Sequence, residues 1–555
     1  MTIDVKSLVN RRAINRWERI SVGDLLERVT WSYPDKEAIV AWEGAYASAA
    51  NKRLSYKDAN EKANQFANAL LDMGLNKGDI VVFFCDNSVE AYLAKMGAAK
   101  AGLVGAPINT MMAPDVVKYL IRLVEPKTAV VDAEVWPRAE KIFTESGLQP
   151  TVTIPIGGSA VPGSATFEDF IKGKSKKEPE VEIHGDDIWE ILFTSGTTSM
   201  PKGAMLSHIY AYMVGHSFAI STTRGLHLEC DLKICSFLPA IYHIADNVMP
   251  VAAFLCGGTF VIGRNPTNIP AMAEAITREK VTALWIGSPL LLEGLTNFFF
   301  NKQDEYDASS LTSIVYGWSA LNPECRKKLK TLCGDSLVLF EIFCQTESIS
   351  CFRFWPDKWP DVYERTAPEV NYVGVPNPLL AAVIMDDDGN FLKGQARTPG
   401  EMVYRSPAIT AGYYKDEEAT ARAFRYGWFH SGDCCMYDED GLAIMVDRYK
   451  DVIKSGGENV SSIRVESVLT LHPKIQKASV IGLPHDKWGE AVTAIVIPEQ
   501  DEEVNEDEII AHCKSKLAAY EVPKKVVVAD SLPETVGGKV LKFKLREQYQ
   551  SLYQS

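Results

Sequence analysis

Residues 54–109 decide the fold class. They read LSYKDANEKANQFANALLDMGL (54–75), IVVFFC (80–85), VEAYLAKMGAAKAGL (89–103) and VGAPIN (104–109). The first and third segments have the apolar spacing of helices, and the second and fourth are short apolar runs typical of strands. Strands that alternate with helices indicate an α/β fold with mainly parallel sheets. The same alternation returns around residues 128–133 and from 281 to 320.

The chain is longer than one hydrophobic core usually supports. Its 555 residues predict two or more domains. The composition shifts near Asp447, and the residues beyond it have the number and the helix and strand pattern of a small domain. We predict a large N-terminal domain over residues 1–447 and a small α+β domain over residues 448–555. Residues 157–180, rich in Gly, Ser and Lys, are predicted to be a polar connector.

Charge and composition exclude several classes. With 58 Lys and Arg against 72 Asp and Glu, the net charge of −14 argues against a broad nucleic-acid surface. The N-terminus lacks the apolar core of a signal peptide, and no stretch is long and apolar enough to span a bilayer, so a cytoplasmic protein is expected. The 11 cysteines form no CxxC pair, which favours reduced thiols over disulfides or a zinc site. No oligomeric state is predicted.

The loop TSGTTSMPKG at 194–203 comes directly after an apolar, strand-like run. Its composition suits an ordinary turn, but glycine, hydroxyls and a lysine also suit a bound phosphate. It is not a Walker P-loop, because Pro201 precedes Lys202 and Gly203 comes after it. A kinase or ATPase of that class is therefore disfavoured.

Seven further segments accompany this loop in chain order. They are LPAIYH (238–243), YGWSALNPE (316–324), FCQTES (343–348), GEMVYRSPAITAGYY (400–414), GWFHSGD (427–433), DRYKDVIKSGGENVSS (447–462) and GGKVLKFKLR (537–546). Each resembles a core motif of the acyl-adenylate-forming superfamily, in that superfamily's order. The superfamily includes acyl-CoA synthetases, luciferases and the adenylation domains of peptide synthetases.

The resemblance implies a site for ATP. The phosphates would be held by the first loop, through Thr194, Ser195, Gly196, Thr197, Thr198 and Lys202. Phe343 would stack on adenine, Thr346 would bond the α-phosphate, and Asp433 and Arg448 would contact the ribose. Outside such motifs, residues of these types more often have a structural role in a turn, in the core or at the surface.

The resemblance also implies the catalytic groups. Glu347 would help ligate Mg²⁺, a hard cation that shares phosphate oxygens with few protein carboxylates. Lys539 would reach the acid and the α-phosphate, and it would stabilise charge as the acyl oxygen attacks phosphorus. Lys202, Thr346, Glu347 and Lys539 are the predicted catalytic residues.

A second environment is implied for the thiol of coenzyme A. Lys450 matches the superfamily's hinge position, about which the small C-terminal domain turns between half-reactions. That turn would remove Lys539 and bring a glycine-rich segment to the thiol tunnel, comprising Lys454, Ser455, Gly456 and Gly457. These glycines suit a plain hairpin equally well.

Some positions depart from the common pattern. Ser199 replaces a glycine, as in carnitine-CoA-ligase-like members, Cys344 also replaces a glycine, and Ser462 replaces a frequent proline. Trp318 stands where a small residue is common beside the acyl pocket, for which His243, Gly317 and Trp318 are the predicted lining. An indole there favours a compact acid, alicyclic, aromatic or of short to medium chain, over a very long one. Trp318 turned into the core is an equally weighted alternative.

The predicted function is that of an AMP-forming acid-thiol ligase, which uses a small carboxylic acid, ATP and coenzyme A. Three alternatives remain: an adenylation enzyme that loads a separate carrier protein, a luciferase-like oxygenase, and an inert binding or regulatory protein on the same fold. Retention of Lys202, Glu347, Asp433, Arg448 and Lys539 argues against the last of these.

Overall fold

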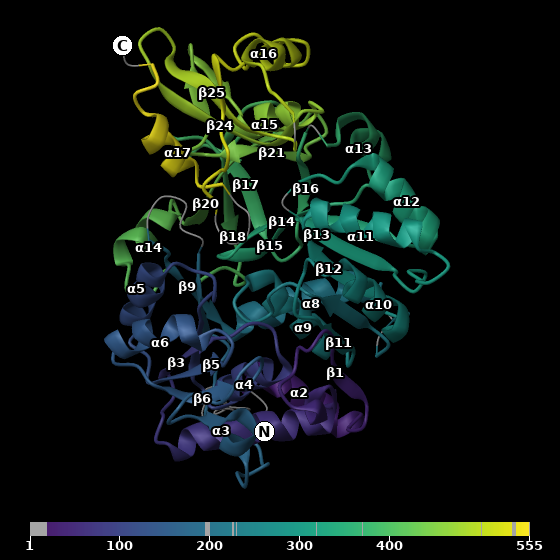
Figure 1. Ribbon diagram of the computed structural model, residues 1–555, viewed down its shortest axis with the longest axis vertical. Helices are drawn as coiled ribbons and strands as arrows, with labels where there is room; N and C mark the ends of the chain where they lie inside the picture. Colours follow the sequence, from purple (N-terminus) through teal and green to yellow (C-terminus); the bar gives the residue numbers. More distant parts are fainter. Residues whose placement is uncertain are drawn as a thin grey trace, which may run out of the picture.

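A computed structural model describes residues 19–194, 200–224, 227–228, 230–317, 319–368, 370–500, 502–534 and 540–553, without the side chains of residues 244–247, 350 and 351. It contains two large sheets and a smaller C-terminal sheet domain (Figure 1). This is the predicted mixed α/β fold, with a large N-terminal part and a small C-terminal part.

The first sheet has seven strands in the order β7-β6-β5-β3-β4-β8-β9. The strands are β3 (Ile80–Phe84), β4 (Val104–Pro107), β5 (Thr128–Asp132), β6 (Pro150–Ile154), β7 (Ala165–Thr166), β8 (Ile188–Phe193) and β9 (Gly203–Ser207). The helices of this region are α3 (Tyr56–Asp72), α4 (Val89–Lys100), α5 (Pro114–Val124), α6 (Trp136–Glu145) and α7 (Phe167–Ile171). All its pairs are parallel except β8 with β9.

The four elements predicted from residues 54–109 are all present, as α3, β3, α4 and β4. Helix α3 begins where Ser55 accepts the amide of Asp58 at 3.1 Å, a typical N-cap. Helix α4 is buried along its whole length, and its Gly97 permits close packing, because a Cβ there would lie 2.8 Å from the carbonyl oxygen of Ala63. The predicted polar connector differs in part, since it contains β7 and the short helix α7, which buries Phe167 and Ile171.

The second sheet has fourteen strands within the described residues. Its parallel part comprises β1 (Glu37–Ala41), β10 (Lys233–Ser236), β11 (Thr259–Ile262), β12 (Ala283–Gly287), β13 (Ser313–Gly317) and β14 (Val338–Gln345). Its antiparallel strands are β2 (Arg53–Ser55), β15 (Ser348–Phe354), β16 (Tyr372–Pro376), β17 (Ala381–Met385), β18 (Gly400–Arg405), β19 (Phe424–Arg425), β20 (Trp428–Tyr437) and β21 (Ala443–Arg448). Antiparallel pairing dominates after β14 because connections without a long crossover helix join neighbouring strands in opposite directions.

The helices of this half include a 3-10 turn at Ala49–Asn51. The others are α2 (Asp24–Ser32), α8 (His208–Thr223), α9 (Ile244–Leu255), α10 (Ile269–Glu279), α11 (Pro289–Asn301), α12 (Pro323–Cys333), α13 (Pro360–Thr366) and α14 (Glu417–Ala423). One apolar core joins the two large sheets, since Phe83 and Leu192 of the first sheet share it with Ile234 and Phe260 of the second. Among the described helices, none has the length and apolarity that a membrane span requires.

The C-terminal domain lies beyond β20 and β21 at the yellow end of the colour scale (Figure 1). Its strands are β22 (Ile453–Ser455), β23 (Glu458–Val460), β24 (Ile475–His485), β25 (Gly489–Pro498) and β26 (Lys525–Val528), and its helices are α15 (Ser462–Thr470), α16 (Glu506–Lys514) and α17 (Lys542–Tyr549). It has a core of its own between α15, α16 and the sheet. Helix α15 also contacts β21, so this helix connects the two domains.

Candidate active site

The predicted phosphate loop joins the antiparallel strands β8 and β9. Its base is closed by two bonds: the Thr194 amide donates to the Lys202 carbonyl at 2.9 Å, and the Lys202 amide donates to Oγ1 of Thr194 at 3.3 Å. Thr194 and Lys202 are therefore held together at the ends of two strands. The other predicted members of the loop lie outside the described residues, namely Ser195, Gly196, Thr197 and Thr198, together with Ser199.

Tyr413 connects Lys202 with Glu347. The ammonium of Lys202 lies 4.9 Å from the centre of the Tyr413 ring, and the Tyr413 hydroxyl donates to Oε1 of Glu347 at 2.7 Å. Burial, and then the charge of Glu347, raise the pKa of Tyr413, so the hydroxyl remains a donor at neutral pH. The sequence pattern alone assigns no role to Tyr413, and its only signal is its place near the end of the motif over residues 400–414.

A tight turn between β14 and β15 presents Thr346 and Glu347. Gln345 and Ser348 pair directly across the two strands, so the turn is short. The Glu347 carbonyl accepts the Thr410 amide at 2.8 Å, and the carbonyl of Thr346 accepts a long bond of 3.5 Å from the Tyr210 hydroxyl of α8. Helix α8 and the strand-like segment at 410–413 thus hold this turn. Phe343, the predicted adenine contact, is half-buried on β14, opposite Phe352 of β15.

The predicted ribose residues are neighbours. Asp433 of β20 pairs in register with Arg448 of β21, and Nη1 of Arg448 lies 2.7 Å from Oδ1 of Asp433. Asp433 is buried, whereas the Arg448 side chain is about one third exposed. The register of the two strands therefore brings together two residues fifteen positions apart.

Electrostatic interactions connect the ribose pair with the phosphate side. The pKa of Arg448 is raised, first by Asp433 and then, against the effect of burial, by Glu347 and Asp451. The pKa of Lys450 is lowered, mainly by burial. Asp451 opposes this effect, whereas the cations Arg448, Arg546 and Lys202 add to it. Lys202, Glu347, Asp433 and Arg448 are therefore close enough to be candidates for one site.

The residue types at this site fit magnesium bound to a nucleotide. Glu347 supplies hard carboxylate oxygens from a buried position, it accepts a hydrogen bond from the Tyr413 hydroxyl, and its charge contributes to the raised pKa of Arg448. When bound, magnesium would neutralise charge on the phosphate oxygens.

The predicted acyl residues come from two other segments. His243 precedes α9 at the end of the segment 238–243, and burial lowers its pKa to about 4, so the ring is neutral at pH 7. Gly317 ends β13, where a Cβ would lie 2.7 Å from the Ile342 carbonyl oxygen, so close packing accounts for this glycine. Trp318 lies outside the described residues.

The segment before His243 is held by buried polar groups. Nδ2 of Asn87 donates to the Leu238 carbonyl at 2.8 Å, and Lys95 donates to the Ile241 carbonyl at 2.6 Å. Lys95 also pairs with Glu190 of β8 at 2.6 Å. These side chains, which sequence reasoning missed, connect the acyl segment with the strand that leads into the phosphate loop.

The predicted coenzyme A residues lie on the hairpin of β22 and β23. Gly456 and Gly457 have φ angles of 63° and 89°, a left-handed conformation that favours glycine. The Gly456 amide donates to the Trp488 carbonyl at 2.7 Å, and the Lys454 amide donates to Oε2 of Glu490 at 2.7 Å. These contacts attach the hairpin, including Ser455, to β25 and the turn before it.

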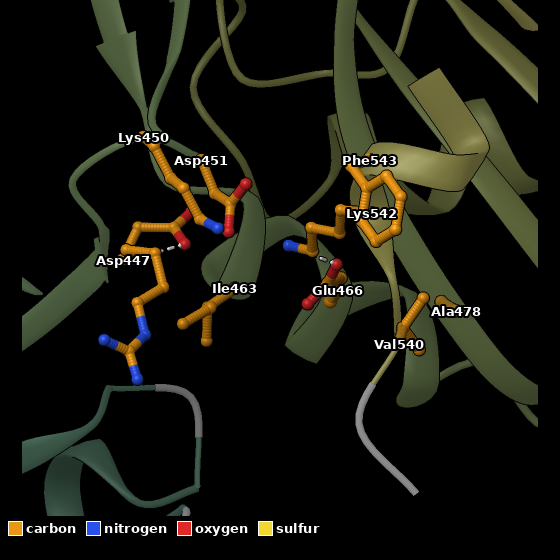
Figure 2. Close-up of a pocket in the computed structure, with 10 residues that line it drawn as sticks. Asp447, Lys450, Asp451, Ile463, Glu466, Ala478, Val540, Lys542 and Phe543 are labelled. Carbon is orange, nitrogen blue, oxygen red and sulfur yellow. Dashed lines mark hydrogen bonds and ion pairs between the residues drawn. The ribbon is translucent and has the colours of Figure 1, made fainter. Parts of the chain in front are cut away.

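Lys539 lies outside the described residues, but Val540 after it lines a cavity between the two domains. The cavity measures about 190 Å³, and Arg448, Lys450 and Lys542 also line it. Figure 2 shows Val540 and Lys542 on one side and Asp447 and Lys450 on the other. Val540 directly follows the predicted catalytic residue Lys539, and Arg448 is a predicted ribose contact. Residues next to or within two predicted parts of the site therefore line this cavity.

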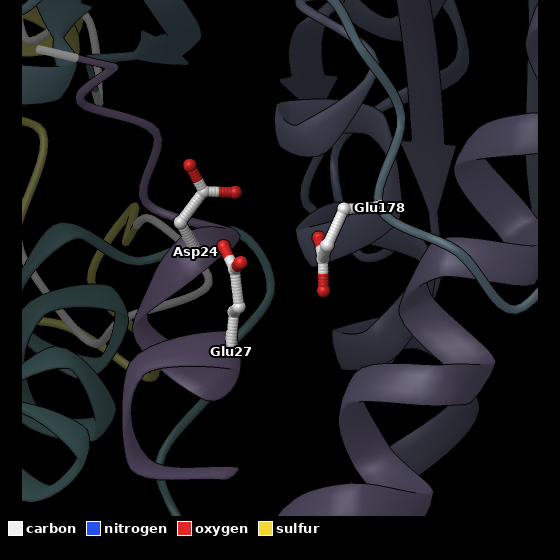
Figure 3. A group of neighbouring side chains, drawn as sticks. All are labelled: Asp24, Glu27 and Glu178. Atoms are coloured by element: carbon white, nitrogen blue, oxygen red, sulfur yellow. The ribbon is translucent and has the colours of Figure 1, made fainter. Parts of the chain in front are cut away.

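Three acidic side chains gather elsewhere, at the start of α2: Asp24, Glu27 and Glu178 (Figure 3). Oxygens of the three lie within 4.8 Å of one another. Nε of Arg19 pairs with Asp24 at 2.8 Å, and Lys100 pairs with Glu178 at 2.5 Å. These two cations offset most of the charge of the three carboxylates, so the cluster is explained as an ion-pair network.

Comparison with known proteins identifies the fold and its two parts. The family model described as AMP-binding enzyme matches residues 26–414, and the model described as AMP-binding enzyme C-terminal domain matches residues 464–539. The long-chain-fatty-acid–CoA ligase FadD13 of Mycobacterium tuberculosis is 30% identical over 527 residues, which cover 94% of this chain and 99% of its own. The 4-hydroxybutyrate–CoA ligase 2 of Metallosphaera sedula is 28% identical over 536 residues, which cover 94% and 93%.

A solved structure agrees in fold over almost the whole chain. ATP-bound MatB from Rhodopseudomonas palustris superposes with a TM-score of 0.79 at 26% identity, covering 96% of this chain and 100% of its own. The first family model alone spans more than half of the chain. The chain belongs to the family of AMP-binding enzymes, within the acyl-adenylate-forming superfamily.

Proposed function

We propose that this enzyme is an AMP-forming acyl-CoA ligase for a compact carboxylic acid. It would activate the acid with ATP to an acyl-adenylate and pyrophosphate, and would then transfer the acyl group to coenzyme A. The observation that carries the proposal is the single site formed by Lys202, Tyr413, Glu347 and the Asp433–Arg448 pair. This site combines cations for phosphates with a buried carboxylate for magnesium and a carboxylate for ribose.

The chemistry explains why such a site is needed. A carboxylate resists attack by a thiol because it is anionic and lacks a good leaving group. Transfer to AMP removes both obstacles, and pyrophosphate leaves. The thiol then attacks the acyl carbon, the bond to the AMP oxygen breaks, and AMP departs with the electron pair.

In the first step the chain's own residues bind and orient the nucleotide. Lys202, Thr194 and the loop residues 195–198 hold the β- and γ-phosphates, while Asp433 accepts bonds from the ribose hydroxyls. Thr346 bonds the α-phosphate. Lys539 stabilises the charge that develops as the acid attacks, a role that suits a cation placed at the reacting oxygens.

The second step requires another arrangement of the small domain. We propose a domain boundary at residues 448–451 with a hinge at Lys450. A turn there withdraws Lys539 and presents Lys454, Ser455, Gly456 and Gly457 to coenzyme A. The two glycines support this role, because their backbone can approach a ligand closely.

The substrate class rests on Trp318. An indole beside the acyl pocket, together with His243 and Gly317, leaves room for an alicyclic, aromatic or short to medium chain. The names of the relatives include both a long-chain fatty acid and 4-hydroxybutyrate, so the family alone leaves the acid open. The cytoplasmic location predicted from the sequence stays a prediction.

The test is acid-dependent exchange of pyrophosphate into ATP with Mg²⁺, over a panel of acids from alicyclic and aromatic to long-chain. Coenzyme A is then added to the acids that respond, and AMP release is measured. Exchange with compact acids and release that depends on coenzyme A support the proposal. Exchange without such release indicates a carrier-loading enzyme, and no exchange with any acid indicates an inert binding protein.

A further inference from the structure

The carboxylate of Asp447 contacts both sides of the boundary between the two domains. Its Oδ1 accepts the amide of Arg448 at 2.7 Å, and its Oδ2 accepts the amide of Ser462 at 2.6 Å and also the Ser462 hydroxyl. Asp447 is almost fully buried. One side chain at the end of β21 thus holds the backbone of the ribose-side arginine and the first residue of α15.

Ser462 extends this connection to α17. The ammonium of Lys542, the first residue of α17, donates to the Ser462 hydroxyl and pairs with Oε1 of Glu466 at 2.8 Å. The same Glu466 oxygen accepts the amide of Val480 at 2.7 Å. Figure 2 shows the Lys542–Glu466 pair on the far side of the cavity from Asp447. Ser462 lies between them, since its hydroxyl accepts from Lys542 and donates to Asp447.

The hydrogen bonds that run from Asp447 through Ser462 to Lys542 form a relay, and the position of Lys542 in the chain suggests its role. Lys542 lies three residues after Lys539, and Val540 between them lines the interdomain cavity with Arg448. Burial lowers the pKa of Lys542, but Glu466 and Asp447 outweigh it and the pKa is raised, so the ammonium stays charged. Hydrogen bonds with charged partners are stronger than neutral ones, especially away from water.

We propose that Asp447 is a positioning residue, whose carboxylate acts through Ser462 and Lys542 to hold the start of α17, the helix that follows Lys539 in the chain, in a fixed relation to Arg448. The inference rests on the proposed function, since it assigns the relay to the adenylation step. The bonds from Ser462 to Asp447 also join residues on opposite sides of Lys450. They must break if the small domain turns at that residue.

Ser462 offers a variant that removes the relay while preserving the helix. Ser462→Pro lacks both the amide and the hydroxyl, yet proline is favoured at the first position of a helix. The preceding Ser461 already has φ −74° and ψ 116°, which a proline after it requires. Ser462→Thr keeps both donors and is the conservative rescue. Thr470→Ala, at the exposed other end of α15, is the matched control.

The kinetic test separates the two half-reactions. For Ser462→Pro we expect the kcat of acid-dependent pyrophosphate exchange to fall at least about tenfold, because one charge-assisted bond has about that effect and the variant loses the three that Ser462 makes, with the KM for ATP little changed. Thioester formation from supplied acyl-adenylate should keep its wild-type rate, and Ser462→Thr should restore exchange. Exchange within twofold of wild type, or equal loss in both half-reactions, would overturn the proposal.

Hydrogen–deuterium exchange of residues 540–549 tests the relay without any activity. Ser462→Pro should raise amide exchange at the start of α17 about tenfold. Ser462→Thr and Thr470→Ala should match the wild type. Unchanged exchange in Ser462→Pro would refute the relay. If the wild type adenylates no acid, the proposed function fails, and this measurement still decides whether Asp447 positions α17.

Discussion

Asp433 and Arg448 face each other across strands β20 and β21, with 2.7 Å between Oδ1 of Asp433 and Nη1 of Arg448. Both were expected at the ribose from the sequence. The strand pairing shows that they also depend on each other, because the buried carboxylate has the arginine as a charged partner. The proposed ribose contacts and the stability of this sheet are therefore coupled.

Arg448→Ala should weaken both the binding of ATP and the stability of the sheet. Removing one partner of a buried ion pair costs several kcal/mol, and partial exposure of Arg448 reduces the expected loss to about 1–3 kcal/mol. We expect a lower midpoint of thermal unfolding and a KM for ATP raised at least about tenfold, the size of a lost charged contact. Arg397→Ala is the control, because its pair with Glu439 is exposed. Equal effects of Arg448→Ala and Arg397→Ala would contradict the proposed contact of Arg448 with the ribose.

Tyr413→Phe should lower the rate of adenylation by about three- to tenfold, because Glu347 loses a hydrogen bond of ordinary strength. The ring under Lys202 remains in this variant, so Tyr413→Ala should lower the rate further. The measurement is the rate of pyrophosphate exchange as a function of magnesium. Tyr426→Phe, in an exposed side chain, should behave like the wild type. A wild-type rate in Tyr413→Phe would refute the role given to the hydroxyl.

Lys539→Ala should abolish most adenylate formation and leave most thioester formation from a supplied acyl-adenylate. The reason is that the proposed charge stabilisation acts only when the acid attacks phosphorus. Each half-reaction is measured separately, by pyrophosphate exchange and by release of AMP. Lys516→Ala, an exposed lysine of the same domain, should change neither. Equal loss of both half-reactions would exclude the alternating-domain model.

Trp318→Ala should shift the preferred acid toward longer chains. If the indole limits the acyl pocket, its removal opens space for several methylene groups, each worth roughly 0.8 kcal/mol when buried. The measurement is kcat/KM of exchange across a series of acids of increasing length. An unchanged length profile would place the indole in the core, the alternative weighed from the sequence.

His208→Asn should reduce the acid sensitivity of the fold. Burial lowers the pKa of His208 to about 3, against a usual value near 6.5, and its Nδ1 accepts the Val22 amide at 3.1 Å. The unfolded chain therefore binds more protons between pH 6.5 and 3. This contribution to stability is present above pH 6.5 and is lost as the pH falls through that window.

Asparagine keeps an acceptor near the position of Nδ1 but does not titrate. The midpoint of thermal unfolding, measured from pH 7.5 to 4.5, should fall less steeply in this variant than in the wild type. His227→Asn serves as a comparison, since His227 is exposed. Parallel curves for wild type and His208→Asn would exclude a contribution from His208.

Local pattern was sufficient for the elements between residues 54 and 109, because amphipathic spacing and short apolar runs reflect which side chains each element must bury. It failed for residues 165–171 within the predicted connector, where Phe167 and Ile171 pack into the core despite polar neighbours. It also missed Tyr413, Lys95 and Asp447. Their roles depend on partners more than fourteen residues away, and a local pattern does not contain those partners.

The sequence by itself determined the fold class, the family and the identities of the charged groups, since residue type and order carry that information. Only the tertiary structure decided which groups are partners. The register of β20 and β21 pairs Asp433 with Arg448, and the docking of α15 and α17 connects Asp447 to Lys542. Such partnerships depend on distances set by packing, and charges that are remote in sequence interact strongly only when folding brings them within a few ångströms away from water.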